Sequence, residues 1–546
     1  MTTDGLENLG IGTNGKGRNK DYSLASGYGE FMERLQNRIL FDNYRFEEIG
    51  KQLDFVYAPD EEFWNKKQML NNCSNILKKS YKIDTNKELT EFVNNPQIDE
   101  SQLMLPFYSV FDNKLIMLPY QLLLYAVGSN GMAAGNTNEE AITQGICEIF
   151  ERYVLRKIFT DAISLPTIPN SYYDKTNIDK AIKKIESEDG YKIIVKDCSL
   201  GLGLPVVGVL VLDTQHGLYN FNIGADCNPL IAIERCLTEL YQNSNDIFET
   251  ETDFAGIYND SYQNIQKCVI NGSGHWPISI MLDGNDFDMN TPFFMQQIEN
   301  DLQYCVSLVK KLGFNIYIRN NSFLKFPAFH IIIPGMSELI ISHKNIFEDS
   351  SNASLFELIR NLDKLSFFEY QQLSYILDKE YETLSKKGET LNSFLPANTD
   401  DDLKNLDLNL FSFMLHYRIG EYNNALNYLE YFLKDKSKTT YIYFFCAKNF
   451  VKLFKIKGLP INIVIDVLSK CYGESLANEV SNDLADNTTI FKYYNLPSCP
   501  KCDVCKLKKS CKYDTIIQIE KKLNKLVKNA SINQSSTSKL FNSISY

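Results

Sequence analysis

The spacing of hydrophobic side chains changes along the chain and divides it into a mixed region and a helical region. Apolar residues at every third or fourth position predict amphipathic helices at residues 22–42, 86–95, 137–160 and 230–242. Apolar runs predict strands at residues 192–195, 204–212, 314–318 and 330–334. A Pro334-Gly335 turn closes the last of them. Residues 1–390, which begin with a Gly/Asn/Lys-rich loop, are therefore expected to form an α+β domain.

The pattern becomes entirely helical after a Pro/Asn/Thr/Asp stretch at residues 392–402, which is typical of a linker. Amphipathic helices are predicted at residues 406–419, 422–434 and 439–457. The spacing of Gly420, Tyr422 and Ala425 resembles a tetratricopeptide helical hairpin, but no clean repeat of that length follows, so a helical bundle fits equally well. We expect a helical, tetratricopeptide-like domain at 403–490 and a cysteine-containing segment with a tail at 491–546. Residues 530–546, rich in Ser and Asn, are expected to be disordered.

Composition narrows the class of protein. A chain of 546 residues, 44% hydrophobic and 23% charged, is long enough for two or three globular domains. Its net charge of −12 argues against nucleic-acid binding. No apolar run is long enough for a membrane span, and the polar beginning has no signal-peptide core. We therefore expect a cytoplasmic protein, and most of its 13 cysteines should be reduced thiols.

Two similar acidic motifs are the strongest chemical signal in the chain. They are Glu30-x-x-Glu33-Arg34 and Glu148-x-x-Glu151-Arg152, each on a predicted helix that follows a Gly-containing loop. Carboxylates three residues apart share one face of a helix, so two such helices would bring four of them together. A third predicted helix places Arg235, Glu239 and Gln242 on one face. Four adjacent carboxylates need cations, and Mg²⁺, which brings phosphates with it, indicates ATP chemistry.

A Gly-x4-Gly-Lys match at residues 10–16 does not predict a conventional phosphate loop. Gly17 stands where a Mg²⁺-binding Ser or Thr is required, and no apolar strand precedes the match. Either Lys16 contacts a phosphate from another kind of loop, or the segment is a plain surface turn.

Four clustered cysteines form a second candidate site. They are Cys499, Cys502, Cys505 and Cys511. This spacing permits a structural Zn²⁺ site or an iron–sulfur cluster, and metal-free thiols remain the third interpretation. The five histidines have no metal-binding spacing, and His330, inside an apolar run, is expected to be a hydrogen-bonded core residue.

Taken together, these motifs resemble the YcaO family over roughly residues 12–490. The resemblance rests on Gly15-Lys16-Gly17, the two acidic motifs, the small-residue loop at 129–137, the Arg235/Glu239/Gln242 helix and the turn at 333–336. It implies an ATP site outside the known nucleotide-binding folds. The implied Mg²⁺ ligands are Glu30, Glu33, Glu148, Glu151 and Glu239. The implied nucleotide contacts are Lys16, Ser26, Asn136, Glu140, Arg152, Arg235 and Gln242.

The resemblance also implies an activity. Enzymes of the family use ATP to phosphorylate a backbone amide oxygen after a nucleophile has added to its carbonyl carbon. The branch with a helical C-terminal part is associated with methylthiolation of a small-subunit ribosomal protein. The implied partners are therefore that protein and a methylthiotransferase, and a homodimer is expected. Two alternatives stay open: an azoline- or thioamide-forming peptide-modifying enzyme, and a non-catalytic helical scaffold with a vestigial ATP site.

Four departures from the family pattern bear on these alternatives. The chain begins close to Gly15, which suggests a missing or remodelled edge of the ATP domain. Ala133 stands where some relatives have a Ser. The C-terminal residues lack the proline-rich tail of azoline-forming members, which weakens that alternative. The cysteine cluster at 499–511 is not expected of the family.

Overall fold

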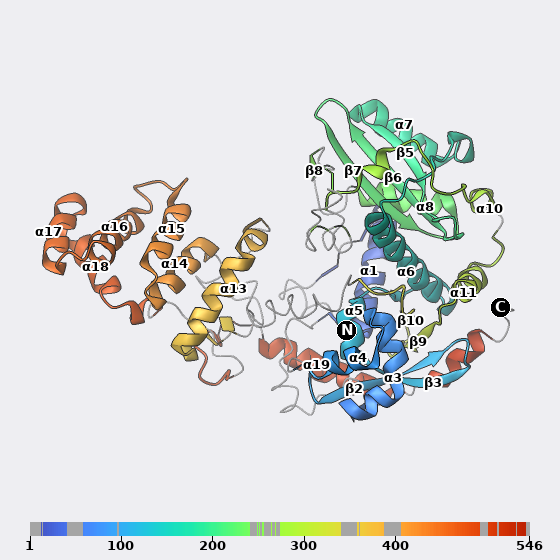
Figure 1. Cartoon of the computed structure of the whole chain (residues 1–546), viewed down its shortest axis with the longest axis horizontal. Helices are drawn as coiled ribbons and strands as arrows, with labels where there is room; N and C mark the ends of the chain where they lie inside the picture. The colour runs from blue at the N-terminus through green and yellow to red at the C-terminus, as the bar shows by residue number, and fades with distance from the viewer. Residues whose placement is uncertain are drawn as a thin grey trace. The chain divides into compact units, whose positions relative to one another are not determined.

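In the computed structural model the chain consists of two compact units (Figure 1). The α+β unit comprises the described residues within 12–40, 56–346 and 522–546, and the helical unit comprises those within 347–521. The structure describes residues 12–13, 15–40, 58–95, 98–240, 248, 250–251, 254–255, 264, 268, 274–296, 298–339, 358–359, 361–386, 406–491, 501–509, 511, 513–530 and 532–541.

The first sheet of the α+β unit is antiparallel and gathers strands from distant parts of the chain. Its order is β1-β2-β9-β10-β4, and β3 pairs with β2. The strands are β1 (Glu62–Asn65), β2 (Ser101–Ser109), β3 (Lys114–Pro119), β4 (Met132–Ala134), β9 (Tyr317–Asn320) and β10 (Ala328–Ile332). The sheet packs against helices α3 (Lys66–Tyr81) and α5 (Tyr120–Val127), and α4 (Asn86–Val93) packs on α3. Two adjacent strands, β9 and β10, thus come about two hundred residues after β2 and β4, the strands with which they also pair.

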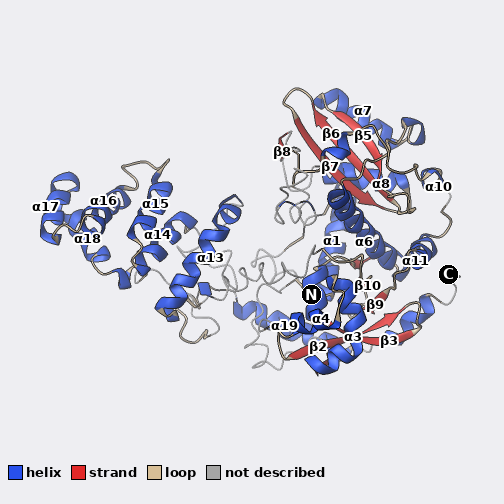
Figure 2. Cartoon of the chain, viewed as in Figure 1, coloured by secondary structure: helices blue, strands red, loops and turns tan. Residues whose placement is uncertain are grey.

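The second sheet has the order β5-β6-β7-β8 and is also antiparallel (Figure 2). Its strands are β5 (Lys192–Asp197), β6 (Val206–Asp213), β7 (Leu218–Ala225) and β8 (Thr250–Glu251). Alternate residues of β6, including Val207, Val209 and Val211, pack with α8 (Pro229–Glu239) and α7 (Asn177–Asp189). The opposite face of β6 and β7 contributes to the main core.

Helix α6 (Asn138–Asp161) packs against both sheets and holds the unit together. The Thr137 side chain accepts a hydrogen bond from the Glu140 N–H and caps the first turn. Apolar residues of α6 pack with Phe221 of β7 and with Phe329 and Ile331 of β10 in one hydrophobic core. Helix α11 (Asp301–Lys311) packs on α6 in the same core, and α1 (Lys20–Gln36) contacts β4 and β10.

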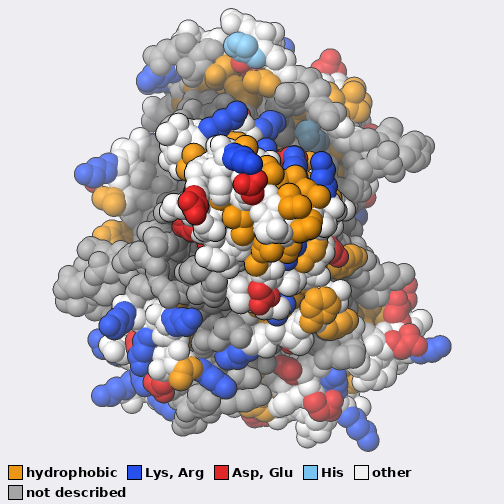
Figure 3. Space-filling model, turned by 90° about the vertical axis from the view of Figure 1, so that its left-hand side faces the viewer, with side chains coloured by type: hydrophobic (Ala, Val, Ile, Leu, Met, Phe, Trp, Pro, Cys, Tyr) orange, Lys and Arg blue, Asp and Glu red, His pale blue; other side chains and the backbone are white. Residues whose placement is uncertain are grey.

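The described part of the helical unit consists of consecutive helices around its own core. They are α13 (Phe367–Lys386), α14 (Leu408–Ile419), α15 (Tyr422–Leu433), α16 (Ile442–Phe450), a π-helical turn (Val451–Ile456), α17 (Ile461–Tyr472) and α18 (Glu474–Leu484). Figure 3 shows hydrophobic side chains gathered on one face of this unit. Helix α17 leaves Ile461, Ile463 and Val467 exposed. No helix in the described ranges is long and apolar enough to cross a membrane.

The predicted fold class is confirmed: a mixed α+β region is followed by a helical one. The predicted strands correspond to β5, β6, β9 and β10, and the helices at 86–95 and 137–160 end within two residues of the prediction. Helix α1 ends earlier than predicted, at Gln36, because Arg38 has a left-handed backbone with φ of 65°. The tetratricopeptide comparison stays a prediction, and the linker at 392–402 lies outside the described residues.

The expectation of disorder at 530–546 is wrong for the described part of that segment. Helix α19 (Tyr513–Asn529) is followed by a 3₁₀ helix (Gln534–Leu540), and Phe541 belongs to the main core of the α+β unit. Gln534 and Thr537 are buried. The described residues within 522–546 therefore belong to the α+β unit, and those within 347–390 to the helical one, while the predicted domain boundaries stay a prediction. The reason is that a few buried residues suffice to anchor a polar segment, which average composition does not reveal.

Candidate functional site

A cavity of about 1660 Å³ lies inside the α+β unit, next to α1, α6 and α8. Eleven of the twelve residues predicted to bind nucleotide or Mg²⁺ line it: Lys16, Ser26, Glu30, Glu33, Asn136, Glu140, Glu148, Glu151, Arg152, Arg235 and Glu239. The twelfth, Gln242, lies outside the described residues. Segments more than two hundred residues apart in sequence thus contribute to one polar wall.

The loop before α1 is packed tightly against the first turns of that helix. A side chain at Gly15 would place its Cβ 1.8 Å from the Ser23 carbonyl oxygen, so this position requires glycine. The Lys16 N–H donates to the Ser26 hydroxyl at 3.3 Å. Asn19 caps α1 by accepting from the Tyr22 N–H. These contacts direct the Lys16 side chain into the cavity.

The first acidic motif carries its own counter-charge. Arg34 lies 3.7 Å from Glu30 and 3.5 Å from Glu33, measured between nitrogen and carboxylate oxygen. Both glutamates line the cavity, as predicted from their spacing on one helix face.

The residues of α6 are held by local hydrogen bonds. Asn136 donates to the Glu140 carboxylate through its backbone N–H at 3.0 Å and through its side-chain amide at 3.1 Å. About three turns further along α6, Glu151 is 6% exposed and accepts from the Ala225 N–H at 3.2 Å. Glu148 lies on the same face and also lines the cavity.

Helix α8 closes the cavity with an arginine and a glutamate. Arg235 donates to the Gln144 side-chain oxygen at 2.8 Å, while its Nε is buried without a hydrogen-bond partner. Glu239 forms an ion pair with Lys16. Lys16, a predicted nucleotide contact, is therefore paired with Glu239, a predicted Mg²⁺ ligand. This ion pair must open before Lys16 can contact a nucleotide or Glu239 can bind Mg²⁺.

The cavity carries more negative than positive side chains. Eight glutamates and two aspartates line it, against one lysine and three arginines. Burial raises the pKa of Glu33 well above its ordinary value, and the neighbouring Glu148 and Glu30 raise it further. Burial also raises the pKa of Glu148, and burial together with Glu239 raises the pKa of Glu151 to about 7. Three carboxylates that resist ionisation indicate that a cation would bind favourably among them.

Oxygen donors of this kind fit Mg²⁺. Among the described residues, no three of these carboxylate oxygens gather within 4.8 Å of one another, so the glutamates surround a space instead of closing on a point. Mg²⁺ usually takes only one or two protein carboxylates and completes its six ligands with water and phosphate oxygens. The donor set therefore fits Mg²⁺ ions held between the walls and a polyphosphate.

The second predicted site is not assembled in the described part of the chain. Cys499 lies outside the described residues, and Cys502, Cys505 and Cys511 are partly exposed. These three sulfurs are not within 4.8 Å of one another, so a metal on this cluster stays a prediction.

His330 is a core residue, as predicted, but not a hydrogen-bonded one. Its ring is fully buried between Phe107 and Tyr120, and neither ring nitrogen has a hydrogen-bond partner. Burial and the nearby Arg319 lower the pKa of His330 to about 3, so the ring is neutral.

Several residues of the cavity wall belong to no motif that the sequence reveals. Asp226 follows β7 and its pKa is raised by burial to about 6, and Asp301 begins α11 on another side of the cavity. The Asp226-Cys227-Asn228-Pro229 turn before a helix was the one available signal for Asp226. Cys147 and Cys227 also line the cavity, and no spacing in the sequence connects them.

Comparison with known proteins agrees with the geometry. Residues 14–337 match the family described as YcaO cyclodehydratase, ATP- and Mg²⁺-binding. The chain is 28% identical to an uncharacterized protein of Haemophilus influenzae over 510 residues, 89% of this chain and 85% of that protein. It is 28% identical over 440 residues, 78% of this chain and 74% of the relative, to the ribosomal protein S12 methylthiotransferase accessory factor YcaO of Escherichia coli K12.

Solved structures resemble the chain more distantly. A YcaO protein of Methanopyrus kandleri with bound AMPPCP and Mg²⁺ is 15% identical with a TM-score of 0.37, and the match covers 60% of this chain and 80% of that one. A heterocyclase in complex with substrate and cofactor is 18% identical with a TM-score of 0.41, and the match covers 59% of this chain and 44% of that one.

Proposed function

The chain belongs to the YcaO family, and from that premise we propose that it uses Mg-ATP to activate a backbone amide of a protein or peptide substrate. One observation carries the proposal. Eleven residues expected to bind nucleotide or Mg²⁺ line a single cavity in which carboxylates outnumber cations by ten to four. A polyphosphate, itself anionic, would bind such a cavity only together with metal ions.

The residues of the cavity divide into two kinds by their charge. Glu30, Glu33, Glu148, Glu151 and Glu239 would hold the Mg²⁺ ions. The phosphates would lie near Lys16, Arg152 and Arg235. At the N-terminal end of α6, Asn136 and Glu140 form a hydrogen-bonded pair. When bound, Mg-ATP would supply the phosphoryl group that makes an amide oxygen a leaving group. The cationic side chains would neutralise charge that develops on the phosphoryl oxygens.

We further propose that the biological role is support of ribosomal-protein methylthiolation. The similarity to the Escherichia coli accessory factor extends over 78% of this chain and so includes more than the ATP-binding region. The partners would be a small-subunit ribosomal protein and a methylthiotransferase. No disulfide links the twelve described cysteines, which supports a cytoplasmic location. A homodimer stays an expectation of the family.

Nucleotide binding by variants tests the site assignment. We expect Glu33→Ala and Glu151→Ala to weaken Mg-ATP binding at least about 100-fold, because each removes a carboxylate from the proposed metal site. Glu91→Ala, on the exposed surface of α4, is the matched control and should bind like the unchanged protein. Calorimetric titration with a non-hydrolysable ATP analogue measures the affinity. Unchanged affinity in both cavity variants would remove the assignment.

The biological role needs a separate measurement. Mass spectrometry of small-subunit ribosomal proteins from cells with and without the gene should show less methylthiolated aspartate when the gene is absent. Unchanged methylthiolation, with phosphate release stimulated by another peptide, would instead favour an azoline- or thioamide-forming enzyme.

A further inference from the structure

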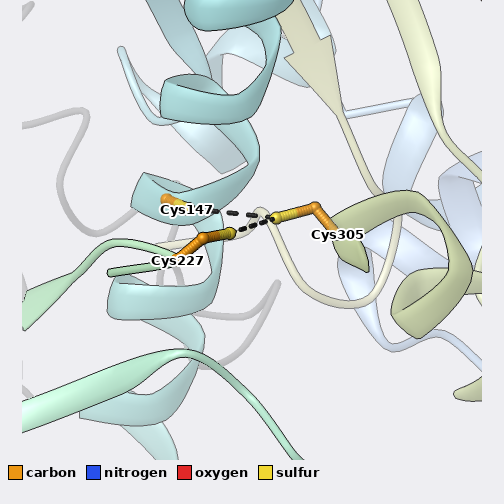
Figure 4. Close-up of side chains that lie close together, drawn as sticks. All are labelled: Cys147, Cys227 and Cys305. Atoms are coloured by element: carbon orange, nitrogen blue, oxygen red, sulfur yellow. Dashed lines mark hydrogen bonds between the residues drawn. The ribbon is translucent and has the colours of Figure 1, made fainter. Parts of the chain in front are cut away.

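Three buried cysteine sulfurs meet beside the cavity (Figure 4). Cys147 lies on α6, Cys227 in the turn between β7 and α8, and Cys305 on α11. Their side chains are 2%, 4% and 0% exposed. The Sγ atoms of Cys147 and Cys305 are 4.0 Å apart, those of Cys227 and Cys305 are 3.5 Å apart, and all three lie within 4.8 Å. In the described ranges this is the one group of three potential metal ligands at such spacing.

The sulfur–sulfur distances match the ligands of one metal ion. Zn²⁺ binds thiolates at about 2.3 Å in a tetrahedron, which places two sulfurs on the same ion about 3.8 Å apart. A disulfide would hold two sulfurs at about 2.05 Å. An iron–sulfur cluster spreads four thiolates over two or four irons, which requires a wider arrangement and one more cysteine than these three. The observed spacing therefore fits a single tetrahedral ion better than either alternative.

The group is open on one side. Cys147 and Cys227 line the cavity, whereas Cys305 lies behind them in the core. A metal ion held by the three sulfurs would thus have an entry path and a fourth coordination position facing the cavity. Three protein ligands with an open position are typical of reactive zinc sites, whereas structural zinc sites have four protein ligands.

Rigid elements hold two of the three ligands. Cys147 and Cys305 lie within helices α6 and α11, which pack on each other in the main core. Cys227 is placed by the turn in which the Asn228 N–H donates to Asp226 at 2.8 Å, and Asn228 then caps α8. The sulfurs are therefore held at this spacing by the fold itself.

We propose that Cys147, Cys227 and Cys305 form a binding site for one Zn²⁺ ion, with the fourth position taken by water from the cavity. Soft thiolates bind Zn²⁺ in preference to Mg²⁺, whereas the carboxylate oxygens of the neighbouring glutamates prefer Mg²⁺. The two metals would therefore occupy adjacent sites without competing. This site is separate from the cysteines at 499–511, and it requires no nucleotide.

Cobalt substitution tests the site. The protein is the full chain in which Cys499, Cys502, Cys505 and Cys511 are replaced by serine, purified without oxygen and stripped of metal. Titration with Co²⁺ should saturate at about one ion per chain and produce the near-ultraviolet absorption of thiolate–cobalt bonds. A large excess of Mg²⁺ should leave this absorption unchanged. No thiolate–cobalt absorption, or a Cys227–Cys305 disulfide found by mass spectrometry in the oxygen-free protein, would overturn the proposal.

Two serine variants in the same background separate coordination from packing. Cys305→Ser should weaken Co²⁺ binding by more than about 100-fold, because it removes one of three ligands. Cys73→Ser is the matched control: its thiol is also fully buried in the α+β unit but donates only to the Met117 carbonyl at 3.3 Å. It should bind Co²⁺ normally, and equal losses in the two variants would contradict the proposal.

Crystals of the unchanged chain give a measurement that does not depend on the variants folding. After soaking with Zn²⁺, anomalous scattering at the zinc edge should show a peak between the three sulfurs. Absence of that peak, with zinc elsewhere in the crystal, would overturn the site. Because neither experiment contains ATP, their failure would leave the proposed nucleotide function untouched.

Discussion

Glu151 shows at the scale of one residue how the cavity would favour a bound cation. Its carboxylate is 6% exposed, and its one recorded hydrogen bond comes from the Ala225 N–H. Burial and the nearby Glu239 raise the pKa of Glu151 from 4.5 to about 7. Such a group costs stability whenever it is ionised in the folded protein without a counter-ion. We therefore expect a cation bound beside Glu151 to stabilise the folded protein.

The pH dependence of stability follows from this shift. A raised folded-state pKa means that the contribution of Glu151 to stability is complete below pH 4.5 and is lost as the pH rises to about 7. We expect Glu151→Gln to raise the free energy of unfolding of the metal-free protein by roughly 1–3 kcal/mol at pH 8 and by little at pH 4.5. Urea unfolding at both pH values measures it. A variant less stable than the unchanged protein at pH 8 would contradict the explanation.

His330 is the second residue whose surroundings allow a firm prediction. Its two ring nitrogens are buried without partners, and an unsatisfied buried polar group costs about 1–3 kcal/mol. We expect His330→Leu to keep or raise the free energy of unfolding, by up to about 1 kcal/mol, because an apolar side chain of similar size carries no such cost. His330→Ala, which leaves a cavity, should lower it by about 2–4 kcal/mol. Denaturant unfolding compares the two, and equal losses would indicate a hidden hydrogen bond of the imidazole.

At the scale of elements, the site depends on the close packing of α6 against the first sheet. The loop before β4 approaches β10 so closely that Ile331 donates its N–H to the Gly131 carbonyl at 2.8 Å. Gly145 of α6 faces the same strand, where a Cβ would come within 2.4 Å of the Ile331 side chain. This approach sets the position of α6 and, with it, of Glu148 and Glu151.

Gly131 is the point at which that packing can be tested. Its φ is +83°, and an added Cβ would lie 2.2 Å from the Ile331 carbonyl oxygen. We expect Gly131→Ala to lower the free energy of unfolding by more than about 2 kcal/mol, from left-handed strain together with the clash. Gly284→Ala, where no atom lies within 4 Å, is the control and should change little. Calorimetric melting of the full chain measures both, and similar melting curves would refute the packing argument.

At the scale of the whole molecule, the C-terminal segment completes the α+β unit. Gln534 is 5% exposed, and its side-chain amide accepts from the Asn320 N–H and donates to the Asn320 carbonyl, each at 2.9 Å. It thus substitutes for a neighbouring strand beside β9. Phe541 stacks on Tyr108, and Leu540 lines the cavity.

Removing the Gln534 amide should therefore lower the stability of the α+β unit at β9, more than two hundred residues away in the sequence. We expect Gln534→Ala to lower its free energy of unfolding by about 2–4 kcal/mol, because two backbone groups of Asn320 lose their partner. Lys539→Ala, on the exposed side of the same segment, is the control and should stay within about 0.5 kcal/mol. Hydrogen exchange of the β9 amides provides the local measurement, and unchanged protection in Gln534→Ala would show that the segment is not anchored this way.

The sequence by itself determined the elements whose reasons are local. Periodicity placed the strand at 192–195 and the helix at 137–160, and the Glu-x-x-Glu-Arg spacing put each pair of carboxylates on one helix face. Segments such as α3, α5 and α11 were not predicted, because their burial depends on partners elsewhere in the fold.

Only the tertiary structure decided which of these local features meet. It joined Lys16 to Glu239, gathered the two acidic motifs and α8 around one cavity, and brought the polar C-terminal segment onto β9. It also placed Cys147, Cys227 and Cys305 together, although they are up to 158 residues apart. The physical reason is that packing between sheets and helices depends on contacts between distant segments, and no short-range pattern in a chain records those contacts.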